Sequence, residues 1–330
     1  MDKTKRQLLK GLALAPVLAT PALLLNSTKP TFAAGIPASH TTQVPGIYRF
    51  WVGEFEVTAL LDGYSTMPTD FISGFDPKIA EETNRRTYKP YDPNQISIPV
   101  NGYVVNTGKN LILLDAGAPG FAAPGLGHLS ENLAAAGFQP DDIDTLLFTH
   151  LHVDHVGALL DTNGQKAFVN ANFVCSETEW DFTHDDAIYA ASPEAFRSFI
   201  DLSRQMVAPY AAHRQMFSGE GEILPGITAI PLPGHTPGHT GFALESGGES
   251  LLIWGDVIHF SGLQFANPNW GVVFDADIAQ AQETRAAMLD RASADQMAVA
   301  GMHIDFPGIG YVERMNDTYR YISAPWRSGS

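Results

Sequence analysis

Apolar and polar residues alternate with a period of two along the first third of the chain. The stretch 46–62 (GIYRFWVGEFEVTALLD) alternates over two short runs, as the strands of a β-hairpin at a sheet edge do. A second strand pair is predicted at 102–106 and 110–114, because Thr107-Gly108-Lys109 between them is a hairpin turn signal. Residues 66–98 are rich in Pro, Asp and Asn and show no sustained period, so we expect a loop with at most one short helix.

Strands and helices alternate in the remainder of the chain. Helical spacing of apolar residues predicts helices at 126–136, 154–160, most of 176–217 and 275–294. Short apolar runs predict strands at 145–149, 227–232, 242–244, 251–254 and 297–301. This order is typical of an α+β fold in which two mixed sheets pack together and helices cover their outer faces.

The first 33 residues have the pattern of an export signal. A basic start is followed by an apolar stretch at 11–25 and by Thr31-Phe32-Ala33, a candidate cleavage site. Residues 4–10 (TKRQLLK) resemble a twin-arginine signal with Lys5 in place of the first arginine. We therefore expect export to the periplasm, by the twin-arginine route or as a Sec substrate, with a simple tail as the alternative. Residues 34–330 contain no Gly/Ser-rich linker and are expected to form one domain.

Composition narrows the range of partners. The chain has a formal net charge of −16 although its first residues are basic, and an acidic body repels nucleic acid and anionic membrane surfaces. Small neutral substrates fit better, and a homodimer is left open. The single cysteine, Cys175, lies in an apolar run and is expected to be a buried core residue, so no disulfide forms within the chain.

The candidate chemistry begins in the segment 149–155 (THLHVDH), directly after a predicted strand. Residues two apart in an extended segment point the same way, so His150 and His152 can bind one ion. If the chain then turns into a helix, Asp154 and His155 can reach a second ion nearby. Burying four polar side chains without compensation costs several kcal/mol, and metal binding provides the compensation.

Three more candidate ligands, His235, Asp256 and His303, each follow a predicted strand. Strand ends gather at one edge of a sheet, where sites are commonly built, so we expect all seven residues to converge. Imidazole and carboxylate without thiolate suit zinc, manganese, iron or cobalt. Two divalent ions per chain are expected, with zinc as the first choice.

The same residues resemble the metallo-β-lactamase superfamily over about 46–310. The matching motifs are the His-x-His-x-Asp-His segment, 234–239 (GHTPGH), Gly255-Asp256 and a late histidine. Longer stretches, among them 232–240 (LPGHTPGHT) and 302–310 (MHIDFPGIG), resemble the methyl parathion hydrolase branch, whose relatives include lactonases and arylesterases. The resemblance implies a four-layer αβ/βα sandwich. It also implies one metal on His150, His152 and His235, another on Asp154, His155 and His303, and Asp256 bridging both.

Other residues receive supporting or structural roles. The resemblance places Asp115 near the metals, where it would orient a ligand by a hydrogen bond or only cap a turn, and His239 has the same two alternatives. The remaining histidines have no ligand-like setting and are expected at the surface or in packing: His40, His128, His184, His213 and His259.

The predicted reaction is hydrolysis. Two neighbouring ions can share a water, lower its pKa and leave a bridging hydroxide, with Asp154 or Asp256 as candidates to receive the proton. Aromatic residues are expected to bind an acyl or aryl group: Phe121, Trp180, Phe182, Phe196 and Phe306. Lactones or aryl esters are the leading substrates, with organophosphate triesters as a main or side activity. A glyoxalase-type thiolesterase and a mononuclear iron sulfur dioxygenase are the alternatives.

Overall fold

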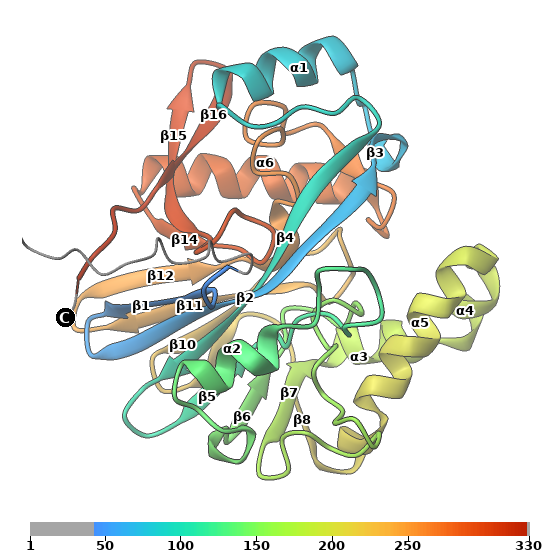
Figure 1. Ribbon diagram of the computed structural model, residues 1–330, viewed down its shortest axis with the longest axis vertical. Helices are drawn as coiled ribbons and strands as arrows, with labels where there is room; N and C mark the ends of the chain where they lie inside the picture. Colours follow the sequence, from blue (N-terminus) through green and yellow to red (C-terminus); the bar gives the residue numbers. More distant parts are fainter. Residues whose placement is uncertain (1–42, 329–330) are drawn as a thin grey trace, which may run out of the picture. The chain divides into compact units, whose positions relative to one another are not determined.

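The predicted hairpin at the start of the fold is an edge hairpin of a seven-stranded sheet. The computed structural model describes residues 43–328, so the predicted export signal and His40 lie outside the described residues. β1 (Ile47–Val52) pairs antiparallel with β2 (Phe55–Pro68), and β1 is the outer strand. The order of the sheet is β1-β2-β4-β5-β6-β7-β8 (Figure 1). Its other strands are β4 (Gln95–Asn106), β5 (Leu111–Leu114), β6 (Thr145–Leu147), β7 (Asn172–Ser176) and β8 (Arg214–Phe217).

A second seven-stranded sheet is formed by the C-terminal half, in the order β16-β15-β14-β12-β11-β10-β9. Its strands are β9 (Gly221–Leu224), β10 (Ile227–Pro231), β11 (Thr240–Ser246), β12 (Glu249–Ile253), β14 (Ala298–Ala300), β15 (Ile309–Met315) and β16 (Thr318–Ser323). Two short strands, β3 (Ile72–Ser73) and β13 (Gly271–Val272), form a separate pair that joins the two halves of the chain.

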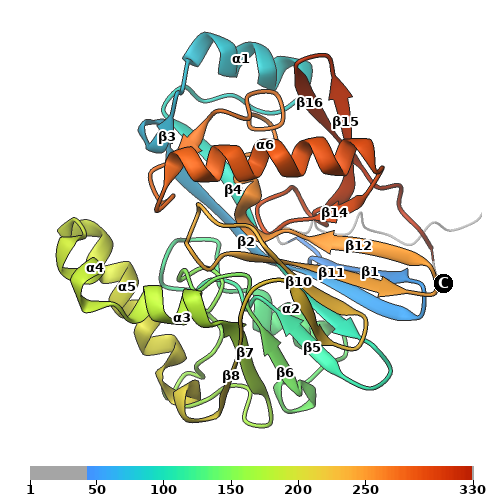
Figure 2. The same cartoon turned by 180° about the vertical axis from the view of Figure 1, so that it is seen from behind.

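Helices cover the outer faces of both sheets. α2 (Leu129–Ala135), α3 (Glu177–His184) and α5 (Glu194–Val207) lie on the first sheet, and α6 (Ile278–Ala294) lies along the second (Figure 2). The remaining helices are α1 (Pro77–Arg86), α4 (Asp186–Ala191) and the 3₁₀ turns η1 (Thr69–Phe71), η2 (Pro140–Asp142), η3 (Ala208–His213) and η4 (Gly255–Val257). Among the described residues no helix is long and apolar enough to span a membrane.

The main core lies between the two sheets. Val57 and Tyr103 from the first sheet and Phe242 and Ile253 from the second are buried in the same apolar cluster. Every second residue of these strands faces the partner sheet, as the alternating pattern requires. Separate cores fill the space between each sheet and its helices. The predicted four-layer αβ/βα sandwich is therefore confirmed, and the described residues from Val44 onward form one compact unit.

The helix predicted at 154–160 is wrong, because this segment forms a series of turns. Several of its peptide groups bond to the chain after β5. The carbonyl oxygen of His155 accepts from the N–H of Ala116 at 2.7 Å, and the N–H of Gly157 donates to the oxygen of Gly117 at 2.7 Å. A helix would have to use the same groups internally, so the long-range pairing excludes it.

Several strands extend beyond the predictions. β2 and β4 continue as a paired ribbon into the segment predicted as loop, up to the pairing of Pro68 with Gln95. β7 ends where the predicted helical region 176–217 begins, and β8 forms a strand at the end of that region. β15 and β16 form an additional C-terminal hairpin. Their partners are distant or edge strands, so local periodicity alone did not reveal them. Cys175 in β7 is buried and free, which confirms its predicted role in the core.

Replacing Gly157 by alanine should destabilise the fold and displace the turn that carries His155. A Cβ at this position would lie 2.1 Å from the carbonyl carbon of Ala118, which is backbone and cannot move away cheaply. We expect a loss of about 1–3 kcal/mol in the free energy of unfolding, measured by denaturant titration. Gly221→Ala is the matched control, because nothing lies within 4 Å of its Cβ position. Equal stability of the two variants would contradict this account.

Candidate metal centre

The centre lies where strands of both sheets end. β10 and β12 run in the same direction, since each pairs antiparallel with β11, and β14 is parallel to β12. Their carboxyl ends therefore lie at one edge of the second sheet, and His235, Asp256 and His303 follow them. The segment that begins with His150 follows β6 of the first sheet. The predicted convergence of all seven residues is thus found, at the facing edges of two sheets rather than one.

Among the described residues, four groups of side chains have potential ligand atoms within 4.8 Å of one another, and one of them consists of His235, His259 and Asp275. The other three groups are His150, His152 and His235; His150, His155 and Asp256; and Asp154, His155 and His303. The Nε2 atom of His235 lies 2.9 Å from Nδ1 of His152 and 3.2 Å from Nε2 of His150. The two triads that the family resemblance implied are therefore both present in the geometry.

Asp256 lies between the two triads. Its Oδ2 atom is 3.3 Å from Nε2 of His235 and 3.2 Å from Nε2 of His303, and its Oδ1 atom is 3.3 Å from Nε2 of His155. Only 2% of the Asp256 side chain is exposed. This carboxylate is placed to contact ions in both triads.

Hydrogen bonds to Nδ1 orient three imidazoles so that Nε2 faces the centre. Nδ1 of His155 lies 2.7 Å from Asp115, Nδ1 of His235 lies 2.8 Å from Asp275, and Nδ1 of His303 donates to the Pro99 carbonyl at 2.8 Å. Each bond fixes the ring and leaves Nε2 facing the other ligands, which is the usual arrangement around a protein-bound metal. Asp275 was predicted only as the start of a helix, and its contact with His235 spans 40 residues of sequence.

Asp115 ties two segments of the centre together. Its carboxylate accepts the N–H and the hydroxyl of Thr149 at 2.9 and 2.7 Å, in addition to its bond with His155. The residue is fully buried and has a φ of 54°, a conformation that non-glycine residues rarely adopt. The bond that the resemblance implied is present, and Asp115 sets the position of the residues on both sides of His150.

His239 supports Asp256 without facing the other ligands. Its Nδ1 donates to the Leu232 carbonyl at 2.8 Å, and its Nε2 accepts the backbone N–H of Asp256 at 2.9 Å. Burial lowers the pKa of His239 to about 3, so the ring is neutral and able to accept this bond. Gly255 makes the approach possible, because a Cβ there would lie 2.4 Å from Nε2 of His239.

The electrostatics of the centre suit a bound cation. Burial favours protonation of Asp256, but the surrounding imidazoles outweigh burial and hold its pKa well below the usual carboxyl value. Burial lowers the pKa of His152 to about 3, whereas nearby carboxylates overcome burial and raise the pKa of His155. The raised pKa of His155 reflects the negative charge that the buried carboxylates concentrate around it, which a cation can balance. Nε2 of His155 and Oδ1 of Asp256 are buried and have no hydrogen-bond partner within residues 43–328, so the set of nitrogen and oxygen atoms fits divalent metal ions.

His259 is a correction to the sequence analysis, which placed it at the surface or in packing. Its Nε2 lies 3.2 Å from Oδ2 of Asp256, its ring centroid is 4.7 Å from that of His235, and the side chain is 6% exposed. Neither ring nitrogen has a hydrogen-bond partner among the described residues. The sequence feature that could have indicated this role is its position three residues after Asp256, beyond the end of the same strand. The other described histidines behave as expected: His128 and His213 are exposed, and His184 stacks on Trp180.

Glu179 was missed entirely, although it joins two ligand-bearing segments. This buried carboxylate accepts the N–H of Leu151 at 3.0 Å and the hydroxyl of Thr236. The backbone of Gly238 also donates to it, and a Cβ on Gly238 would lie 2.2 Å from the nitrogen of Glu179. The first turn of α3 thereby fixes the spacing between the segments of His150–His155 and His235. No local pattern indicates a role that depends on contacts 28 and 57 residues away.

The five aromatic residues predicted to contact substrate lie in different surroundings. Trp180 is a core residue, since α3 turns it toward β7, where it is 7% exposed and packs edge-on against Phe173. Phe306 packs against the core between the sheets, and Phe121 is 73% exposed. Phe182 and Phe196 are half-buried, with the Phe196 ring edge-on to Phe274. Substrate contact by these five residues stays a prediction.

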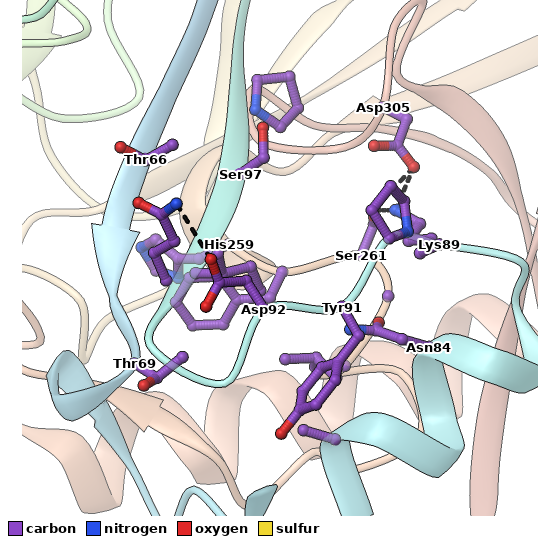
Figure 3. Close-up of a pocket in the computed structure, with 18 of the residues that line it drawn as sticks. Thr66, Thr69, Asn84, Lys89, Tyr91, Asp92, Ser97, His259, Ser261 and Asp305 are labelled. Atoms are coloured by element: carbon purple, nitrogen blue, oxygen red, sulfur yellow. Dashed lines mark hydrogen bonds and ion pairs between the residues drawn. The ribbon is translucent and has the colours of Figure 1, made fainter.

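A cavity of about 410 Å³ adjoins the centre on the side of His259 and His303 (Figure 3). It lies among the ends of β2 and β4, the segment 88–92 after α1, and the segment 259–263. None of the five predicted aromatic residues lines it. Its apolar wall consists instead of Phe75, Ile96, Phe260 and Leu263.

Removing the Glu179 carboxylate should loosen the centre. Glu179→Ala leaves three buried donors without their acceptor, at about 1–3 kcal/mol for each unsatisfied group. We expect a lower free energy of unfolding and at least about tenfold weaker metal binding, measured by denaturant titration and by competition with a chromogenic chelator. Glu177→Ala, at an exposed position of the same helix, is the control. Unchanged metal affinity in Glu179→Ala would show that the carboxylate does not position the ligands.

The chain is similar to known lactonases and hydrolases. The chain is 25% identical over 170 residues to the N-acyl homoserine lactonase AiiA of Bacillus thuringiensis subsp. kurstaki, covering 46% of this chain and 60% of AiiA. It is similar in structure to the hydrolase AbOPH, with a TM-score of 0.81, 31% identity, and coverage of 87% of this chain and 100% of AbOPH. It is also similar to AidC, described as a dizinc quorum-quenching lactonase, with a TM-score of 0.80, 25% identity, and coverage of 86% and 99%.

The family follows from a match to the whole central part of the chain. The family model described as metallo-beta-lactamase superfamily matches residues 98–303, which is more than half of the chain and includes all seven predicted ligands. Together with the αβ/βα sandwich, this match shows that the chain belongs to the metallo-beta-lactamase superfamily.

Proposed function

We propose that this chain is a two-metal hydrolase that opens lactones, with aryl esters and organophosphate triesters as further substrates. The observation that carries the proposal is that Asp256 lies between two triads of side chains, one of three histidines and one of two histidines and an aspartate. His150, His152 and His235 would hold one divalent ion, Asp154, His155 and His303 the other, and Asp256 both. When bound, such a pair supplies a readily ionised water and polarises the carbonyl or phosphoryl oxygen.

The chain's own residues orient the ligands and manage protons. Asp115, Asp275 and the Pro99 carbonyl hold three imidazoles in place, so little reorganisation is needed during the reaction. Asp154 and Asp256 were both candidates to take up a proton. The Asp154 side chain is 32% exposed and that of Asp256 2%, so Asp154 is the carboxylate that can exchange a proton with solvent.

The similar proteins support the lactone assignment. AiiA and AidC are both named as lactonases, and AidC as a dizinc enzyme, whereas AbOPH is named as a hydrolase. This chain spans about 60% of the length of AiiA, and its identity to these lactonases is 25%. The charged residues lining the cavity are one lysine and two aspartates, which gives no basic cluster for a glutathione thioester.

Metal analysis should find two divalent ions per chain. After chelation the protein should lose thermal stability, because ligands that bind only the folded state stabilise it by mass action. Added Zn²⁺ should raise Tm, with elemental analysis giving the stoichiometry. A single iron per chain would point instead to the mononuclear sulfur dioxygenase.

Asp256→Asn should reduce turnover to the background rate while the protein remains folded, because the amide cannot supply the negative charge between the two triads. Purified metal-loaded protein would be assayed with an N-acyl homoserine lactone, dihydrocoumarin and methyl parathion. Asp141→Asn, at an exposed position, is the control and should behave as wild type. No turnover of any of the three substrates by the wild type would refute the proposed function, and an active Asp256→Asn would refute the bridging role.

A further inference from the structure

A polar cluster lines one side of the cavity next to the centre. Lys89, from the segment between α1 and β4, donates to the hydroxyl of Ser261 at 2.7 Å and pairs with Oδ2 of Asp305. Ser261 donates to the same oxygen at 3.2 Å. Figure 3 shows Lys89, Ser261 and Asp305 grouped together at the cavity wall. We call these three residues the Lys89 cluster.

The cluster is connected to the centre through two short stretches of chain. Ser261 is two residues after His259, and Asp305 is two residues after His303. Two residues span at most about 7 Å, so the cluster is held a short distance from the histidines. A ligand in this cavity can therefore have one group at the centre and another at Lys89.

Lys89 retains a donor for a ligand. An ammonium group has three N–H donors, and the described residues provide partners for two of them, Ser261 and Asp305. The side chain is 28% exposed, and its stem lies against Gly262, where a Cβ would be 2.7 Å from the lysine Cδ. The ammonium is thus fixed at the cavity wall instead of moving freely in solvent.

The charge of the wall favours a neutral ligand. The charged side chains lining the cavity are Lys89, Asp92 and Asp305, so the two carboxylates outnumber the ammonium. Asp92 already accepts the N–H of Asn94 at 2.8 Å and the amide of Gln95 at 3.1 Å. An anionic group would meet repulsion from the carboxylates, whereas a carbonyl oxygen could accept the remaining Lys89 proton.

We propose that this cavity binds the substituent of the substrate beside the scissile ester, and that Lys89 selects substituents carrying a neutral carbonyl such as an amide. The apolar wall of Phe75, Ile96, Phe260 and Leu263 would take the attached acyl chain. The preferred substrates are then lactones with an acylamino group rather than unsubstituted lactones. This inference rests on the proposed lactone hydrolysis and adds the residue that determines specificity.

The test compares two lactones in one variant. Lys89→Met keeps the apolar stem and removes the donor. With N-hexanoyl homoserine lactone, kcat/KM should fall about tenfold to 100-fold, mainly through KM, as expected for a hydrogen bond to a charged donor. With an alkyl γ-lactone of similar length but no amide, it should change less than about threefold. Lys78→Met, exposed on α1, is the control.

The outcomes separate this inference from the proposed function. Equal losses for both lactones, or no loss for either, would overturn the role of Lys89. Calorimetric binding of the lactam analogue of N-hexanoyl homoserine lactone gives a readout that needs no turnover. If the wild type hydrolyses neither lactone, the proposed function fails, while about tenfold weaker binding of the lactam to Lys89→Met would still support the cavity assignment and unchanged binding would overturn it.

Discussion

The centre depends on one buried carboxylate and the positive charge that it requires. Asp256 lies within 4 Å of five imidazole nitrogens, from His150, His155, His235, His259 and His303. An ionised carboxylate in such a dry location is costly unless cations or donors compensate it. Divalent ions held between the imidazoles and Asp256 would provide this positive charge. The surrounding architecture serves to bring these imidazoles to Asp256.

Close packing around three glycines makes the arrangement possible. Gly157, Gly238 and Gly255 each lie where a Cβ would be within 2.4 Å of a neighbouring atom. These contacts place turns from both sheets side by side, and buried carboxylates join them. Asp115 links the chain after β5 to that after β6, and Glu179 links the latter to the chain after β10. Ligand geometry is therefore determined by long-range hydrogen bonds rather than by helices or strands that carry the ligands.

Different parts of the fold form the buried centre and the walls of the cavity. The ends of the strands in the two sheets supply a rigid, polar and buried centre, while the segments around α1 and after η4 supply the walls of the cavity. His259 and His303 belong to both regions. If the proposed function holds, a change at Lys89 should alter substrate preference without disturbing the seven predicted ligands, because the Lys89 cluster uses different side chains of the same chain segments.

The sequence alone predicted the features that depend on local pattern. Strand alternation, the apolar runs before each ligand and the THLHVDH segment are all contained in a few neighbouring residues, and they were sufficient to predict two packed sheets and seven converging side chains. The structure decided what depends on partners far apart in the chain. The 154–160 segment forms turns because its peptide groups pair with 116–117. His259, Asp275 and Glu179 join the site through contacts that only folding creates. The cavity walls likewise come from distant segments, since Lys89 and Ser261, which contact each other, are 172 residues apart in the sequence. The period of apolar residues indicates which face of a segment is buried. Contacts between distant segments form only after those faces have packed together.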